Sequence, residues 1–329
     1  MKNRKKDMKL LSIIIPVYNV EAYLRKCLNS LLLPQKWMEK LEVVVVNDGS
    51  PDNSLSIAKE YAWKYPFTFR IIDKKNGGHG SAWNVGLKEA KGKYVKFLDS
   101  DDWLENLSSL MDKLQGNEAD IIFCKKTHYF SETKTTQECS AFSCLKPNKI
   151  YDAETFDWLK FGYYMDITNF QYCTYRKAIL EPFEPLFLEH QCYDDSILFI
   201  APIITCHSFV FYDFPVYNYL LGRPGQTADK QVLVRRYKDK EKVKKQMIKF
   251  YLQHKDVSEG KRRKLDALMR TIIWRHYELL MNLDKPEAKS ETREWHNYVH
   301  SICPQYQQGW RILLYRVLPY DMFKRILHE

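Results

Sequence analysis

Three carboxylates and a hydroxyl follow the end of a short apolar segment in KYVKFLDSDDW, positions 93–103. Asp99, Asp101 and Asp102 repel one another, and placing them beside a buried strand is costly unless something positive is held there. Mg²⁺ and Mn²⁺ prefer oxygen ligands and commonly bind one or two carboxylates together with the phosphates of a substrate. The cluster therefore predicts a divalent-cation site. A solvated aspartate-rich turn that caps a helix near Trp103 is the alternative.

Other polar groups and glycines stand where predicted strands end. Short apolar strands are expected at 11–15, 42–46, 69–73, 94–98 and 120–124, alternating with helices at 21–33, 54–65 and 81–90. This alternation is typical of an α/β layer fold with a mostly parallel sheet. Ligands of such sheets bind outside the carboxyl ends of the strands. We therefore expect the loops that follow the first four strands to form one cleft.

The chain resembles family 2 glycosyltransferases of the GT-A fold, of the bacterial inverting type, in four motifs: PVYNVEAYL, VVVNDGSPDNS, KNGGHGSAWNVGL and FLDSDD. Each motif alone is common, but the four occur in the family's order and spacing. The resemblance is close over residues ~10–105 and weaker to ~229. It implies transfer of a sugar from a UDP-sugar to a hydroxyl of a glycan, glycolipid or glycoprotein acceptor, in bacterial surface polysaccharide or protein glycosylation, with Mn²⁺ or Mg²⁺ as cofactor.

The resemblance also implies residue roles. Asp101 would ligate the metal, Asp99 the metal's shell or the ribose, and Asp102 would lie near the donor sugar. The other implied nucleotide-sugar contacts are Pro16, Tyr18, Glu21, Asp48, Lys75, Gly78 and Arg223. Several have plainer alternatives: Asp48, implied to accept the imide N–H of uracil, also fits a turn aspartate. For Glu21 the alternative is an acidic residue in the first turn of a helix, and for Arg223 it is a residue of a surface turn. We expect His79 to hydrogen-bond on the donor loop.

An inverting transfer needs a base that takes the proton of the acceptor hydroxyl. In this family the base ends an acidic pair at a helix start, and YDDSILF (193–199) matches that segment. Asp195 is therefore the predicted catalytic base, with Asp194 where the family usually has Glu. Two adjacent carboxylates raise one pKa by repulsion, which suits a base. Capping of the helix near Ser196 is the alternative role, and His190 is the fallback base.

The net charge of +10 is concentrated at one end of the chain, since residues 230–329 carry 23 Lys and Arg against 12 Asp and Glu. We expect a domain boundary near 229, between a catalytic GT-A domain (1–229) and a smaller basic helical region (230–329). Without a helix-turn-helix, RNP or OB pattern, KVKK (242–245) and KRRK (261–264) do not predict nucleic-acid binding. Residues 305–329 interleave apolar and basic side chains, which suits an anionic membrane surface and, almost as well, a homo-oligomer contact.

The eight cysteines are scattered, without paired CxxC spacing, and no apolar run reaches ~20 residues. We therefore expect a cytoplasmic protein with reduced thiols. It would be peripheral to the inner face of the membrane if the tail binds lipid. Two other function classes compete. A nucleotidyltransferase acting on sugar phosphates usually carries a Gly-rich stretch with Lys or Arg after its first strand, and PVYNVEAYL lacks it. A non-catalytic basic binding module would bind nucleic acid or membrane without turning over a donor.

Overall fold

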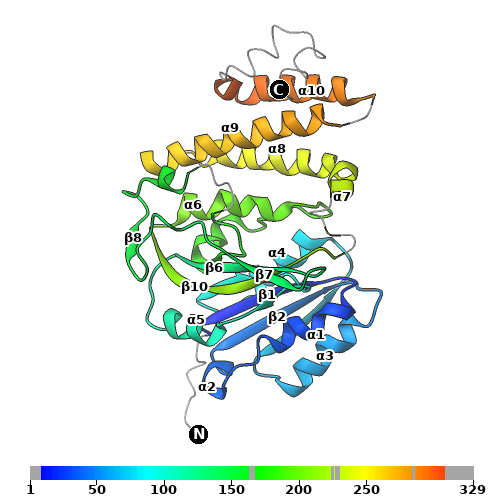
Figure 1. Cartoon of the computed structure of the whole chain (residues 1–329), viewed down its shortest axis with the longest axis vertical. Coiled ribbons are helices and arrows are strands. Elements are labelled where there is room, and N and C mark those ends of the chain that lie inside the picture. The colour runs from blue at the N-terminus through cyan, green and yellow to red at the C-terminus, as the bar shows by residue number, and fades with distance from the viewer. Residues whose placement is uncertain (1–8, 163–166, 224–225, 227–229, 284–285, 308–329) are drawn as a thin grey trace.

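The computed structural model describes residues 9–162, 167–223, 226, 230–283 and 286–307. Within them a ten-stranded mixed sheet runs in the order β3-β2-β1-β4-β9-β6-β10-β5, with β7 paired to β6 and β8 to β10 (Figure 1). The strands are β1 (Leu11–Val17), β2 (Leu41–Asp48), β3 (Phe69–Lys74), β4 (Tyr94–Phe97), β5 (Trp103–Leu104), β6 (Ile121–Phe130), β7 (Thr135–Cys139), β8 (Ile150–Asp152), β9 (Cys173–Arg176) and β10 (Ser208–Leu221). The predicted α/β fold is confirmed.

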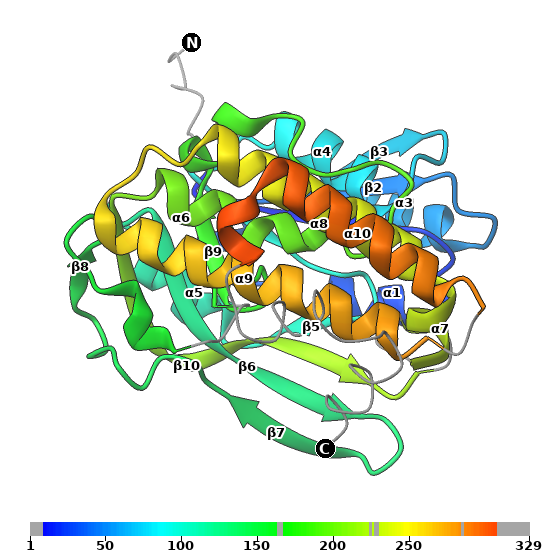
Figure 2. The ribbon, with the colours of Figure 1, turned by 90° about the horizontal axis from the view of Figure 1, so that it is seen from above.

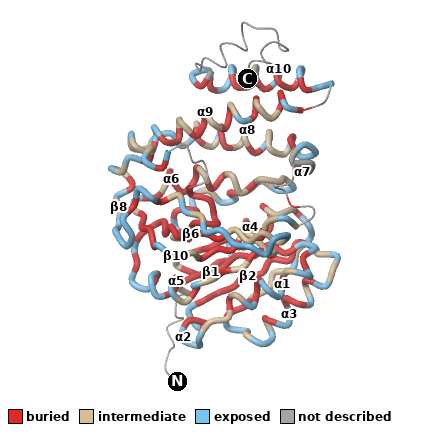
Figure 3. Tube along the Cα trace, viewed as in Figure 1, coloured by how far each residue is buried: buried red, intermediate tan, exposed pale blue. Residues whose placement is uncertain are grey.

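The first half of the sheet is parallel, as predicted, and its middle strands are fully buried (Figure 3). Helices α1 (Glu21–Asn29), α2 (Gln35–Met38), α3 (Ser54–Lys64), α4 (His79–Glu89) and α5 (Leu107–Leu114) connect these strands and follow them. Val44 and Val46 of β2 pack with Ala82 of α4, so the alternate residues Val43 and Val45 point to the other face. Burial on both faces explains the uninterrupted apolar sequence of these strands.

The second half of the sheet is mixed. Strand β9 pairs antiparallel with β4 and β6, whereas β6 and β10 form a long parallel pair. The segment 125–150, expected to be irregular, continues β6 to Phe130 and turns back as β7. The helix expected near Asp195 is instead a 3₁₀ segment, η4 (Asp194–Phe199), followed by the short α6 (Ala201–Thr205). Pro202 explains the break, because it has no N–H to donate to the preceding turn.

The described residues after 229 are mainly helical and lie over the sheet (Figures 1 and 2). It forms α7 (Lys230–Arg235), α8 (Tyr237–Gln253), α9 (Glu259–Met281), α10 (Ala288–Ile302) and η5 (Pro304–Gln307). Two lysines of the KRRK run bind backbone carbonyls of the sheet domain and so hold α9 to it. Lys261 Nζ donates to the Cys206 carbonyl at 2.6 Å, and Lys264 Nζ donates to the Gly162 carbonyl at 2.9 Å. The domain boundary at 229 stays a prediction.

Two further expectations concern membranes. Most of the tail segment 305–329 lies outside the described residues. Among the helices that are described, none combines the length and the apolar character that crossing a bilayer would need.

Candidate active site

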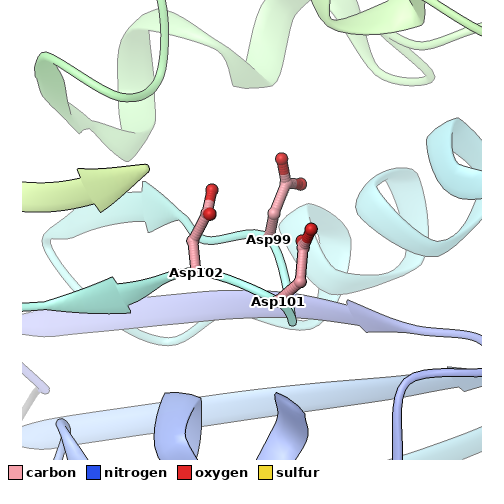
Figure 4. Close-up of side chains that lie close together, drawn as sticks. All are labelled: Asp99, Asp101 and Asp102. Atoms are coloured by element: carbon pink, nitrogen blue, oxygen red, sulfur yellow. The ribbon is translucent and has the colours of Figure 1, made fainter. Parts of the chain in front are cut away.

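The turn after β4 gathers the three aspartates, and one carboxylate oxygen from each lies within 4.8 Å of the others (Figure 4). The turn is closed by the Asp102 N–H, which donates to the Asp99 carbonyl at 3.1 Å. Asp99 and Asp101 line a cleft, whereas Asp102 is buried and accepts hydrogen bonds from Tyr217 Oη at 2.6 Å and the Leu220 N–H at 2.8 Å. Two carboxylates thus face the cleft and the third supports the turn.

The electrostatics of this turn favour a cation. Burial raises the pKa of Asp102 well above its usual range, and Asp101 and Asp99 raise it further. The pKa of Asp101 is raised by burial and by Asp99, and Arg223 opposes the rise. Three acids this close are costly to ionise together, and a divalent ion would remove that cost. The donor set of Asp99 and Asp101, all oxygen and facing the cleft, fits Mg²⁺ or Mn²⁺.

A cationic side chain already stands beside Asp101. Arg223 Nε donates to Asp101 Oδ2 at 2.5 Å, and its guanidinium lies 5.6 Å from the centroid of the Tyr23 ring. The turn after β10 holds it there: Gly222 has φ +87°, and its N–H donates to Gln226 Oε1 at 3.1 Å. The chain just after β10 therefore brings the guanidinium of Arg223 to the acidic loop.

His79, the first residue of α4, joins the two acidic segments. Its Nδ1 lies 3.2 Å from both carboxylate oxygens of Asp194, and its Nε2 lies 3.1 Å from Asp99 Oδ1. Burial lowers the pKa of His79, but Asp194 and Asp99 outweigh burial and hold it well above its usual value. His79 therefore bridges Asp99 of the acidic turn and Asp194 of η4.

Asp195 lies in η4 and, like its neighbour Asp194, lines the cleft, but it is half-buried where Asp194 is buried. Burial and then repulsion from Asp194 raise the pKa of Asp195 to about 7, although His79 opposes the rise. Asp194 is buried and is held by His79. The pair thus divides into one buried carboxylate held by His79 and one half-buried carboxylate with a pKa near neutrality. A carboxylate of that pKa is suited to accept a proton.

Asp48, at the end of β2, fixes the glycine loop. Its Oδ1 accepts hydrogen bonds from Lys74 Nζ at 2.7 Å and the Gly77 N–H at 2.9 Å, and its Oδ2 accepts from the Gly78 N–H at 2.8 Å. Gly78 has φ +89°, and a Cβ there would lie 2.9 Å from the His190 nitrogen. Glycine is therefore required where this loop passes the 188–194 segment.

These groups share one cleft of about 690 Å³. The predicted site residues that line it are Pro16, Tyr18, Asp48, Gly78, Asp99, Asp101, Asp195 and Arg223. Three others do not. Lys75 is exposed outside the lining, Asp102 is buried behind it, and Glu21 Oε2 accepts from the Asn53 N–H at 2.8 Å at the start of α3. His190, the fallback base, lines the cleft and donates its N–H to the Gly77 carbonyl.

Sequence reasoning missed Lys74 and Arg236. Lys74 is the parallel-sheet partner of Asp48, so pairing the ends of β2 and β3 would have identified it in place of Lys75. Arg236 lines the cleft from the start of α8, and no sequence signal pointed to it. Its position depends on how the helices pack on the sheet domain.

Several known proteins with similar sequences are named glycosyltransferases. The glycosyl transferase family 2 model matches residues 12–181, more than half of the chain. The putative glycosyltransferase EpsH of Bacillus subtilis is 39% identical over 128 residues, which are 39% of this chain and 36% of EpsH. The minor teichoic acid biosynthesis protein GgaB of the same organism is 44% identical over 116 residues, 34% of this chain and 13% of GgaB. The chain thus covers about a third or less of these relatives' length.

Solved structures resemble the chain over nearly its whole length. Staphylococcus aureus TarS (residues 1–349, in complex with UDP-GlcNAc) matches with a TM-score of 0.70 at 20% identity, over 96% of this chain and 89% of that one. The mannosyltransferase PcManGT of Pyrobaculum calidifontis, in complex with GDP-Man and Mn²⁺, matches with a TM-score of 0.56 at 15% identity, over 98% and 90%. These likenesses confirm the expected GT-A fold. The family model, which matches more than half of the chain, shows that the chain belongs to glycosyl transferase family 2.

Proposed function

We propose that this chain is an inverting, metal-dependent glycosyltransferase. It moves a sugar from a UDP-sugar to a hydroxyl of a glycan, glycolipid or glycoprotein acceptor in the bacterial cell envelope. The observation that carries the proposal is the cleft itself: the oxygen ligands Asp99 and Asp101 and the carboxylate Asp195, of pKa about 7, line it together. We assign all the proposed catalytic and donor-binding residues to the predicted domain 1–229, while Arg236 completes the cleft lining from the helical region.

The donor end of the cleft is assigned to Pro16, Tyr18, Asp48 and Gly78. Asp48 is held rigidly by Lys74 and two backbone N–H groups, and a fixed carboxylate is well suited to accept the imide N–H of uracil. Tyr18 is 52% exposed, so its ring is free to stack on a base. The UDP and UDP-GlcNAc complexes of TarS support a uridine donor.

Asp101 and Asp99 would hold Mn²⁺ or Mg²⁺, which when bound neutralises the diphosphate and favours its departure. Arg223, paired with Asp101, is placed to bind a phosphate oxygen as well. We assign Asp102 to support of this turn, because its carboxylate is already engaged by Tyr217 and Leu220. The Mn²⁺ complex of PcManGT supports a metal in this fold.

Asp195 is the proposed base: it accepts the proton of the acceptor hydroxyl as that oxygen attacks the anomeric carbon. His79 fixes Asp194 and Asp99 on either side of the reaction centre and so positions both the base segment and the acidic loop. Asp195 itself stays ionisable near neutral pH. The proton then has an acceptor inside the cleft, where a water-exposed carboxylate of ordinary pKa would be too weak a base.

Release of UDP tests the function. The protein is incubated with Mn²⁺ and a panel of nucleotide sugars, and free UDP is followed. We expect slow release from one UDP-sugar, lost when a chelator is added and lost in Asp101→Ala. No release from any donor would reject the proposed activity, and release that survives both the chelator and Asp101→Ala would reject its metal dependence.

Peripheral membrane contact is proposed for the tail on its composition alone, which mixes apolar and basic side chains over 305–329. Vesicles containing anionic lipid should pull down the full chain, and deletion of 308–329 should reduce that binding. If binding is unchanged by the deletion, the tail is left with the subunit-contact role.

A further inference from the structure

Two helices of the basic region carry a group of three cations, one of which lies next to the segment of the proposed base. Lys240 of α8 lies with its Nζ 4.4 Å from the centroid of the Tyr193 ring, two residues before Asp195. Lys240 and Asp195 attract each other, and Arg275 of α9 repels Lys240. Lys244 follows one helical turn later on the same face of α8, about 5–6 Å from Lys240. Lys240, Lys244 and Arg275 form what we call the cationic ledge.

The cations of the ledge have no carboxylate partner within ion-pair distance among the described residues, unlike others on α8. Arg236 pairs with Asp239 at 3.3 Å, Lys238 with Glu291 at 2.6 Å and Lys245 with Glu241 at 2.5 Å. In the ledge, Glu278 is the acid nearest Lys244, and its carboxylate accepts a hydrogen bond from Trp274 Nε1 at 2.6 Å. Arg236 lines the cleft and is paired, whereas Lys240, next to Tyr193, and Lys244 lie outside the cleft lining and have no carboxylate at this distance in the described part of the chain.

This arrangement is costly for the free protein. Lys240 and Lys244 are half-buried, and the pKa of Lys244 is lowered to about 7 by burial and then by repulsion from Lys240 and Arg275. A bound anion removes that repulsion and accepts hydrogen bonds from ammonium and guanidinium groups at once. The donor's diphosphate has its own partners at the acidic loop. A separate anion is needed, and the acceptor is the substrate that approaches Asp195.

We infer that the cationic ledge binds a phosphate ester of the acceptor, so that the enzyme glycosylates a hydroxyl lying close to a phosphate. This rests on the proposed function, which places the acceptor hydroxyl at Asp195. Lys244 lies one helical turn beyond Lys240, so the phosphate belongs to the same residue as the hydroxyl or to the next one. A phosphodiester-linked polyol or sugar polymer and a glycan carried on a lipid phosphate share this chemistry.

Binding is measured by calorimetry on the full chain with UDP and Mn²⁺ present, so that the donor end is filled. The probes are a synthetic glycerol phosphate hexamer, a short-chain alkyl phosphate of N-acetylglucosamine, and maltohexaose as the neutral probe. We expect a phosphate probe to bind and maltohexaose not to bind. Lys244→Met and Arg275→Gln should each weaken the phosphate probe about tenfold or more, as for loss of a hydrogen bond to a charged group.

Lys249→Met is the matched control, because Lys249 is an exposed lysine on the same helix, and this variant should bind as the wild type does. Thermal melting checks the folding of each variant, and Lys244→Met should melt no lower than the wild type because it removes repulsion. Tighter binding of the hexamer indicates a polymer acceptor, and tighter binding of the alkyl phosphate a lipid-linked one.

Absence of binding by both phosphate probes, equal binding of maltohexaose, or equal losses in Lys249→Met would overturn the inference. UDP release from the donor into water by the wild type, with no acceptor present, reports the proposed function separately. If release occurs and the phosphate probes fail, only the acceptor assignment is wrong. If no donor is hydrolysed, the proposed function fails regardless of the ledge.

Discussion

At the scale of the residue, the two adjacent aspartates of η4 show how packing gives one side chain type two roles. Asp194 is buried against α4 and bonded to His79, so its position is fixed. Asp195 faces the cleft, and the repulsion of its fixed neighbour helps to raise its pKa to about 7. A lone surface aspartate would be ionised but only weakly basic. The pair thus gives Asp195 a pKa that suits the proposed role of a base near neutral pH.

Asp195→Asn should abolish transfer while leaving donor binding intact. The amide has nearly the same shape but cannot take a proton, and one general base contributes about 10²–10⁴ in rate. Turnover with acceptor and affinity for UDP are measured side by side. The matched control is Asp112→Asn, an exposed aspartate of α5 remote from the cleft. Unaltered turnover in Asp195→Asn would show that another group, with His190 the first candidate, is the base.

The pH dependence of transfer follows from the raised pKa of Asp195, about 7. The base must be deprotonated, so the rate should fall tenfold per unit below about pH 7 and level off above it. The free energy of unfolding changes with pH in the opposite direction. Asp195 keeps its proton up to about pH 7 in the folded protein but only up to about pH 4 in the unfolded chain. The folded state is therefore favoured at low pH, and this contribution is lost as the pH rises from about 4 to 7. Asp195→Asn should therefore gain stability relative to the wild type between pH 5 and 8, measured by urea unfolding.

At this scale the sequence predicts strand-end residues well and loop residues less well. Asp48, Asp99 and Asp101 each end a buried strand or follow it directly, so their place at the cleft could be deduced from the apolar runs before them. Lys74 and Lys75 differ by one position, and only the register of β2 with β3 shows which of them reaches Asp48. The position of Arg236 at the cleft could not be predicted from local sequence, because it depends on how the helices pack on the sheet domain.

At the scale of the element, the start of α4 determines how the two acidic segments meet. A Cβ on Gly80 would lie 2.3 Å from the Leu188 carbonyl oxygen and 2.4 Å from Asp194 Oδ2. Because glycine has no side chain there, α4 approaches the 187–194 segment closely enough for His79 to reach Asp194. The GGHG sequence indicated a backbone that must come close to something. Its close neighbour here is the base segment.

Gly80→Ala should separate these segments. The added methyl group meets two oxygens and Phe187 Cβ at 2.9 Å, and such overpacking costs about 1–3 kcal/mol. We expect lower stability in urea unfolding together with a large loss of transfer. Gly116→Ala is the control: its Cβ meets nothing within 4 Å, so only its positive φ of +77° is penalised, by about 1 kcal/mol, with transfer unchanged. Equal effects on transfer in the two variants would contradict this account.

Which elements form could be predicted from local sequence, whereas how some of them pair could not. Strands β1, β2 and β3 are apolar runs separated by helices, a pattern that specifies parallel neighbours. Strand β9 lies between β4 and β6 in the opposite direction, and this depends on contacts between residues about 50–80 apart in the chain. No local signal encodes such a pairing, because a strand's side-chain pattern is the same in either direction.

At the scale of the whole molecule, the sheet domain and the basic helices are joined by one continuous apolar core. Buried residues from Leu11 in β1 to Tyr306 in η5 belong to a single cluster. Lys261 adds a polar tether, since its Nζ donates to the Cys206 carbonyl at 2.6 Å and pairs with Glu154 at 2.5 Å. The sequence placed Lys261 in a basic patch, because one-dimensional charge counts cannot show burial.

Unfolding should therefore be a single transition that involves both parts. Trp83 in the sheet domain and Trp295 in α10 are fully buried reporters, and single-tryptophan variants that keep one or the other should give the same urea midpoint. Lys261→Met should lower both midpoints together, because it leaves the buried Cys206 carbonyl unpaired at about 1–3 kcal/mol. Arg262→Met, at an exposed neighbouring position on α9, is the control and should change neither.

Two separated midpoints, or a shift confined to Trp295, would mean that the helices unfold on their own and that the cleft forms without them. The cationic ledge would then be a mobile attachment and could not hold an acceptor at Asp195.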